Sequence, residues 1–117
     1  MMSAIHSALS GLGAYAKQIE VSANNVANIN TDGFKKSRTE FISVETGGVL
    51  SVVRQDDSTG PTVLRDSGYG PTHLELSNVD LGEETVNQIL AQRGFEANVT
   101  TLKTIDDMLG TILDIKK

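Results

Sequence analysis

The stretch from Asn28 to Gly33 holds residue types that can bind a metal ion. Asn28, Asn30 and Asp32 alternate before a glycine, which matches the first half of a calcium-binding EF-hand loop. Such a loop needs a bidentate glutamate at its twelfth position, and that position here is Thr39. Three basic residues within the next five positions would also repel a cation. The stretch therefore predicts a turn that ends a helix, because asparagine and glycine tolerate left-handed backbone.

Other motifs with catalytic associations stand in contexts that do not support an enzyme. Gly11–Ala16 fits the G-x-G-x-x-A dinucleotide fingerprint, but it lies inside a helical pattern rather than after a strand. His6 and His73 have no nearby cluster of ligands and no nucleophile in a recognised motif. Asp66–Gly68 indicates a turn, and Asn98–Thr100 is a glycosylation match inside a predicted helix. We therefore expect no catalytic residue, no metal and no cofactor.

Composition narrows the class of protein further. The chain has 117 residues, which suits one domain or one domain with long arms, and only 4% of them are aromatic. So few large anchors favour an extended helical shape completed by neighbouring chains. The net charge of −5 disfavours nucleic acid and membrane-surface binding, and the chain has no cysteine. No apolar run approaches the roughly 18 residues of a membrane span, and no secretory signal is visible.

Residues 1–31 are predicted to form an N-terminal helical segment. Its apolar residues are spaced by 4, 3, 4, 3, 4 and 3 positions, which is the heptad pattern of helices that pair. We call these residues the apolar seam: Ile5, Leu9, Leu12, Ala16, Ile19, Ala23 and Val26. A helix from Ile5 to Ile29 would be about 37 Å long. Gly11 and Gly13 weaken this helix by up to about 1 kcal/mol each, unless they permit close approach of another helix.

Residues 32–77 are predicted to form a small β-rich insert with loops. Three runs have strand composition: 40–44, 49–54 and 62–64. Gly47-Gly48 suits a tight hairpin turn between the first two runs. The stretches Asp56–Gly60 and Asp66–Pro71 indicate exposed loops.

Residues 78–117 are predicted to form one long C-terminal helix. Asp80 followed by Glu83 resembles a capping box, and Lys116 and Lys117 suit the negative end of a helix dipole. Apolar residues follow at helical spacing: Val86, Ile89, Leu90, Phe95, Val99, Leu102, Ile105, Leu109, Ile112 and Ile115. The expected fold is mainly α with a small β insert, its terminal heptad helices forming a coiled coil or helical bundle. The helices pair either within one chain, as a hairpin, or between chains.

Two stretches near the ends of the chain carry a resemblance to a known family. Ala23–Lys35 (ANNVANINTDGFK) is similar to the N-terminal motif of bacterial flagellar basal-body rod and hook axial proteins. Ser77–Leu81 (SNVDL), Glu83-Glu84 and Ala91–Asn98 (AQRGFEAN) resemble the family's C-terminal signature. The roughly 45 residues between the motifs resemble a proximal rod subunit in length, whereas the wording of both motifs is closer to distal rod and hook members.

The resemblance implies a structural, non-enzymatic subunit of the flagellar basal-body rod. It implies self-association through the terminal helices, contact with other rod or hook proteins, and export by the flagellar type III apparatus without a cleaved signal. The rival interpretation is a stand-alone helical adaptor or chaperone-like module that binds an amphipathic helix of a partner. The two differ in symmetry, because rod contacts propagate head to tail and an adaptor saturates at a fixed stoichiometry.

The heptad pattern and the resemblance together predict a set of interface residues. They are Ile5, Leu9, Leu12, Ile19, Asn24, Val26, Asn28, Phe34, Asn78, Val79, Arg93, Phe95, Asn98, Leu102, Ile105, Leu109 and Ile112. We expect the amides of Asn24, Asn28 and Asn98 to bond backbone groups where the helix frays, or to fix register between packed helices.

Overall fold

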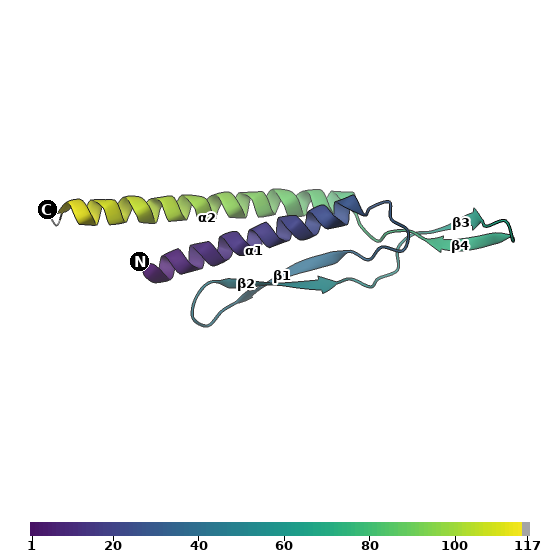
Figure 1. Ribbon diagram of the computed structural model, residues 1–117, viewed down its shortest axis with the longest axis horizontal. Coiled ribbons are helices and arrows are strands. Elements are labelled where there is room, and N and C mark those ends of the chain that lie inside the picture. Colours follow the sequence, from purple (N-terminus) through teal and green to yellow (C-terminus); the bar gives the residue numbers. More distant parts are fainter. Residues whose placement is uncertain (116–117) are drawn as a thin grey trace.

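The computed structural model describes residues 1–115, so the prediction for Lys116 and Lys117 lies outside the described residues. Two long helices flank four strands (Figure 1). In chain order the elements are α1 (Met2–Ala27), β1 (Ser37–Ser43), β2 (Val49–Gln55), β3 (Thr62–Asp66), β4 (Pro71–Glu75) and α2 (Leu81–Ile115). The shape is elongated, with extents of 83 × 24 × 16 Å. The predicted fold class, mainly α with a small β insert between terminal helices, is confirmed.

The helices form an antiparallel hairpin in which α2 returns along α1 (Figure 1). Gly11 and Gly94 set how closely they approach. A Cβ on Gly11 would lie 2.6 Å from Oδ1 of Asn98, and a Cβ on Gly94 would strike the ring of Tyr15. Gly11 thus permits the close approach that the sequence suggested. A Cβ on Gly13, by contrast, would meet nothing within 4 Å.

The face that α1 buries is not the apolar seam. The buried residues of α1 are small or polar: Ala8, Gly11, Ala14, Ser22 and Asn25. In the seam, Leu9 is 54% exposed and Ile19 is 37% exposed. The helices thus pair as a hairpin within the chain, but the seam is only partly covered, because Ile5, Leu12 and Val26 are half-buried while Leu9 and Ile19 are exposed. Small side chains lie between the two helices because the distance between helix axes depends on the side chains at the contact, and only small ones allow a close approach.

The hydrophobic core within the chain is small. Its buried apolar members are Ala8 and Ala14 on α1 and Ala91 and Ile105 on α2. The last turns of α2 extend past the start of α1 (Figure 1), and Ile115 there is 78% exposed. Much of the aliphatic surface of both helices is thus left outside the fold.

The first hairpin, β1–β2, packs along α1. Its strands pair antiparallel from Ser37 opposite Gln55 to Ser43 opposite Val49. The two strands are joined at the predicted place, but by a five-residue loop over 44–48 rather than by a tight Gly47-Gly48 turn. The backbone N–H of Gly47 donates to the oxygen of Val44 at 2.9 Å, and both glycines have positive φ, +98° and +91°, which favours glycine. The ring of Phe41 meets that of Tyr15 edge to face, with centroids 5.0 Å apart. The backbone N–H of Val49 also donates to the Ser10 hydroxyl at 3.0 Å.

The second hairpin, β3–β4, projects beyond the helices at the end opposite the chain termini (Figure 1). It is a separate two-stranded sheet, whereas the sequence suggested one small hairpin or sheet. The predicted loop Asp66–Pro71 is wrong at both ends, because Asp66 closes β3 and Pro71 opens β4. The strand β4 was missed because Pro71 indicated a loop, although proline is tolerated as the first residue of a strand.

Candidate functional site at the junction of the helices and the first strand

The asparagine-rich end of α1 is satisfied by local bonds. Nδ2 of Asn28 donates to the backbone oxygen of Asn24 at 2.9 Å, and the Thr31 hydroxyl donates to Oδ1 of Asn28 at 3.0 Å. Gly33 follows with φ of +71°. These contacts end the helix in the predicted turn. Of the two expected roles, Asn24 and Asn28 therefore have the local one within the described chain, because their amides bond groups at the end of α1.

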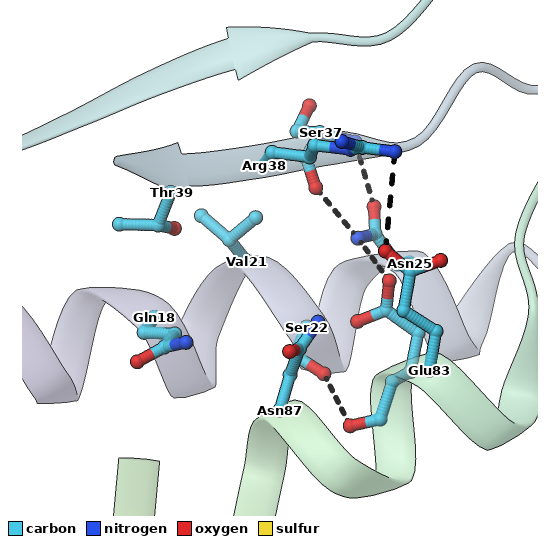
Figure 2. A pocket seen from close by; sticks show the side chains of 10 residues that line it. Gln18, Val21, Ser22, Asn25, Ser37, Arg38, Thr39, Glu83 and Asn87 are labelled. Atoms are coloured by element: carbon cyan, nitrogen blue, oxygen red, sulfur yellow. Dashed lines mark hydrogen bonds and ion pairs between the residues drawn. The ribbon is translucent and has the colours of Figure 1, made fainter. Parts of the chain in front are cut away.

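Asn25, which the sequence reasoning missed, joins three elements. It is 1% exposed. Its Oδ1 accepts from the backbone N–H of Ser37 at 3.0 Å, and its Nδ2 donates to the Ser37 oxygen at 2.8 Å and to Oε1 of Glu84 at 2.9 Å (Figure 2). Both amide hydrogens and the amide oxygen are thereby used. One side chain thus ties α1 to the first residue of β1 and to the first turn of α2.

Glu84 is the buried carboxylate of this junction. It is 3% exposed, and its backbone oxygen accepts from the Ser22 hydroxyl at 3.3 Å. Its position in the first turn of α2 is favourable for a negative charge, as the sequence predicted. Within residues 1–115, however, no basic side chain forms an ion pair with it.

The predicted capping box at the start of α2 is only half formed. Oδ1 of Asp80 accepts from the backbone N–H of Gly82 at 2.9 Å and more weakly from that of Glu83 at 3.4 Å. The Glu83 carboxylate does not return to Asp80. It accepts instead from Nζ of Lys36 at 2.9 Å, because that buried ammonium group needs a charged partner.

Two basic and two acidic side chains form a network beside the junction. Lys36 lies 2.9 Å from Glu83 and 4.0 Å from Asp56, while Arg38 lies 3.0 Å from Asp56 and 4.0 Å from Glu83. The pKa of Asp56 is held below its usual value, chiefly by the backbone N–H of Ser58 and in smaller part by these two cations. The network fixes the beginning of β1 against the beginning of α2.

Asn78 makes a second amide clamp. Its Oδ1 accepts from the backbone N–H of Lys36 at 2.7 Å, and its Nδ2 donates to the backbone oxygens of Asp56 and Ser58 at 2.8 and 3.0 Å. Sequence analysis predicted Asn78 as an interface residue, and its amide is fully used inside the chain.

Lys35 secures the base of the second hairpin. Its ammonium group pairs with Glu75 and donates to the backbone oxygen of Ser58 at 2.8 Å. The pKa of Glu75 is lowered, first by the hydrogen bond from Lys35 and then by the backbone N–H of Gly60. The Lys35-Lys36 pair of the first motif therefore meets residues of the second motif and its flank.

A small cavity of about 170 Å³ lies between α1, β1 and α2 (Figure 2). Its lining is mainly polar and comprises Gln18, Val21, Ser22, Asn25, Ser37, Arg38, Thr39, Glu83, Glu84 and Asn87. The buried hydroxyl of Thr39 has no hydrogen-bond partner. Among the described residues, no group of three or more His, Cys, Asp or Glu side chains is placed to hold a metal ion.

The other predicted interface residues divide between the inside and the outside of the hairpin. Phe95, Leu102 and Leu109 are half-buried on α2, and Ile105 is buried. Asn98 packs on Gly11 and donates to the backbone oxygen of Gly94 at 2.8 Å. Half-buried residues of α1 and of the connecting segments are Ile5, Leu12, Val26, Phe34 and Val79. The exposed ones are Leu9, Ile19, Arg93 and Ile112.

Within residues 1–115, no helix is long and apolar enough to cross a membrane.

Comparison with known proteins matches both ends of the chain. A family model described as flagella basal body rod protein matches residues 5–35, and one for the C-terminal part of flagellar basal body rod FlgEFG proteins matches residues 71–115. The flagellar hook protein FlgE of Escherichia coli is 49% identical over 86 residues, covering 68% of this chain and 21% of that protein. FlgE of Borreliella burgdorferi is 36% identical over 80 residues, covering 68% and 17%. The flagellar basal-body rod protein FlgG of Bacillus subtilis is 34% identical over 89 residues, covering 75% and 32%. The chain thus spans less than a third of the length of each of these relatives.

Proposed function

Because this chain belongs to the flagellar rod and hook axial protein family, we propose that it is a structural subunit of the flagellar basal-body rod. In this proposal it has no enzyme activity, and it polymerises through the outer faces of its terminal helices. Other rod or hook proteins contact the same faces where the polymer of this chain begins or ends. Export runs through the flagellar type III apparatus without a cleaved signal.

The observation that carries the proposal is the apolar seam that α1 leaves outside the helical hairpin. Leu9 is 54% exposed and Ile19 37%, although both stand at heptad positions. α2 also leaves large aliphatic side chains exposed near both of its ends, where Val86 is 55%, Leu90 59% and Leu113 65% exposed. Aliphatic side chains at heptad positions of α1 are typical of a helix that packs on a partner, and burying the exposed half of each would contribute roughly 1 kcal/mol.

The arrangement of these faces favours contacts that propagate. The outer faces of α1 and α2 differ in sequence, so contact between α1 of one copy and α2 of the next is head-to-tail. Such contacts extend into a helical polymer when the rotation between copies does not close a ring. An adaptor would instead present one groove to one partner helix, and exposed aliphatic side chains on two separate helices do not fit that arrangement.

The proposal is tested by removing the seam without disturbing the inner face. The double variant Leu9→Ser/Ile19→Ser keeps every buried residue of α1, so its monomer should fold. Leu64→Ser is the matched control, since Leu64 is 66% exposed but lies on β3. Light scattering of concentrated solutions should show large species for the wild type and the control, and at least tenfold weaker association for the double variant. Equal association of all three would contradict the proposal.

A further inference from the structure

We propose that the β3–β4 hairpin is a pivoting arm, and that the ion pair between Lys35 and Glu75 is the clasp that sets its direction. We call residues 61–75 the arm, and the two helices with the first hairpin the body. The arm projects from the body at the end opposite the chain termini (Figure 1). The arm and its clasp lie within one chain, so neither requires the proposed self-association.

No helix or strand of the body packs against the arm. Within residues 1–115, neither β3 nor β4 contacts α1, α2, β1 or β2. All residues of β3 are exposed, and half-burial in β4 begins only at Leu74 and Glu75, next to the base. Burial of apolar surface is the main force that fixes elements against each other. The direction of the arm must therefore be set by contacts at its base.

The base of the arm is a crossing of two chain segments in direct backbone contact. The backbone N–H of Leu76 donates to the Pro61 oxygen at 2.7 Å. A Cβ on Gly60 would strike the backbone oxygen of Leu76 and lie 3.1 Å from the nitrogen of Asn78. Glycine thus leaves no side chain to wedge the crossing, and its backbone freedom suits a pivot.

The body side of this pivot is fixed by Asn78. Its amide binds backbone groups of Lys36, Asp56 and Ser58, so the chain on both sides of the arm is tied to the body up to these positions. Beyond them, the hydrogen bonds and ion pairs that join the arm to the body all involve the segment 32–35, which follows α1. This segment therefore holds the direction of the arm.

The Lys35 ammonium group bridges the two sides of the pivot. It pairs with the Glu75 carboxylate on the arm, and it donates to the Ser58 oxygen on the body at 2.8 Å. The Lys35 and Glu75 side chains are 21% and 35% exposed, so salt and water screen this pair less than a surface pair. The Lys35–Glu75 pair is thus the strongest contact between the arm and the body.

The other contacts between the arm and the body are weaker. The backbone N–H of Gly33 donates to the Glu75 oxygen at 2.9 Å, as a neutral hydrogen bond. Arg65 pairs with Asp32 at 3.5 Å, but their side chains are 64% and 41% exposed, and such surface pairs contribute little. Loss of the Lys35–Glu75 pair should therefore release the arm from its single direction.

The arm holds its own shape through internal bonds. Its two strands pair antiparallel along their whole length. At the tip, the backbone N–H and the hydroxyl of Ser67 both donate to the Gly70 oxygen, at 3.3 and 3.1 Å. The Thr72 hydroxyl donates across the strands to the Arg65 oxygen at 3.1 Å. The arm should thus move as one unit when the clasp opens.

The test measures the distance between spin labels on the arm and on the body. The chain has no cysteine, so the labels are attached through Leu64→Cys on the arm and Ala97→Cys on α2, both at exposed positions. In this background, Lys35→Met and Glu75→Gln each remove the ion pair. Each should broaden the distribution of distances about twofold or more, because the arm then populates several directions.

A matched variant and a second label pair provide the controls. Arg54→Met removes an exposed ion pair with Glu40 in the first hairpin, and it should leave the distribution narrow. Labels at Ala4→Cys on α1 and Ala97→Cys on α2 report on the body alone, and their distribution should keep its width in every variant. Dilution with unlabelled chain ensures that every distance lies within one copy.

Several outcomes would overturn the clasp. They are a narrow arm-to-body distribution in both variants, a broad one in the wild type, or broadening of the label pair within the body. If Lys35→Met fails to fold by far-UV circular dichroism, Glu75→Gln decides. Failure of both variants to fold would also overturn it, because the ion pair would then hold the fold and not the direction of the arm.

Cross-strand nuclear Overhauser effects between Val63 and Leu74 test whether the arm moves as a unit. These residues are opposite each other in the register, so the signals should persist in both variants. Their loss would contradict the pivot, because the ion pair would then be needed for the hairpin itself.

Discussion

Asn25 is the residue on which the junction depends most. Its amide makes three hydrogen bonds to β1 and α2, and its removal would leave the backbone groups of Ser37 and the Glu84 carboxylate without a partner. We expect Asn25→Ala to lower the free energy of unfolding by about 2–4 kcal/mol, since each buried group left unsatisfied costs about 1–3 kcal/mol. Urea denaturation measures the change.

The neighbouring residue provides the control for Asn25. Asn24 is exposed, so Asn24→Ala should change stability by no more than about 0.5 kcal/mol. Equal effects of the two substitutions would show that the amide of Asn25 does not hold the junction.

The carboxylates beside the junction predict how stability depends on pH. Hydrogen bonds lower the native pKa values of Asp56 and Glu75 below their ordinary values of 3.8 and 4.5. A lowered native pKa contributes stability above the unfolded-state value, and this contribution is lost as pH falls through the native value. The free energy of unfolding should therefore decline below about pH 4.5 and continue to decline below pH 3.8.

Glu75→Gln should flatten part of this acid dependence, as urea titrations between about pH 3 and pH 6 would reveal. Asp57→Asn is the control, because the Asp57 side chain makes no hydrogen bond or ion pair within residues 1–115. An unchanged slope for Glu75→Gln would mean that the Lys35 contact does not persist in solution.

At the scale of the helices, the two glycines of α1 give a matched pair. Gly11→Ala would place a methyl group 2.6 Å from Oδ1 of Asn98, so either the Asn98 amide must leave its bond to the Gly94 oxygen or the helices must separate. We expect a loss of about 1–3 kcal/mol despite the better helix propensity of alanine. Gly13→Ala meets nothing within 4 Å and should gain about 0.5–1 kcal/mol. Thermal unfolding of both variants measures the difference, and a gain for Gly11→Ala would contradict the close helix approach.

The elements could be predicted from sequence because each has a strong local signal. Heptad spacing predicted both helices, and Gly47-Gly48 predicted the place where the first hairpin turns. The orientation of α1 could not be predicted in the same way, because large aliphatic spacing does not say which face meets its own chain. Asn25 lies two heptads after Gly11, on the face of small residues, and that spacing is the signal that could have revealed it.

The junction shows why the motifs resist interpretation from sequence. Lys36 is separated from Glu83 by 47 positions and Asn25 from Glu84 by 59, so only the folded chain brings them together. The amides of Asn24, Asn28, Asn78 and Asn98 are engaged within the chain. The predicted interface residues that lie exposed are Leu9, Ile19, Arg93 and Ile112. A role for them in contacts between copies stays a prediction.

At the scale of the whole molecule, an elongated hairpin with a small core leaves heptad surfaces unpartnered. Helices gain most of their stability from packing, and within this chain α1 and α2 pack on each other with only a small core. The proposed assembly has two supports: the chain belongs to the rod and hook family, and its apolar seam is partly exposed.

The most direct test of this account is sedimentation velocity of the wild-type chain over a concentration series, with far-UV circular dichroism on the same samples. The account predicts species that grow with concentration, accompanied by rising helicity as the outer faces find partners. A monomer with full helicity at every concentration would contradict it, because the outer seam would then need no second copy.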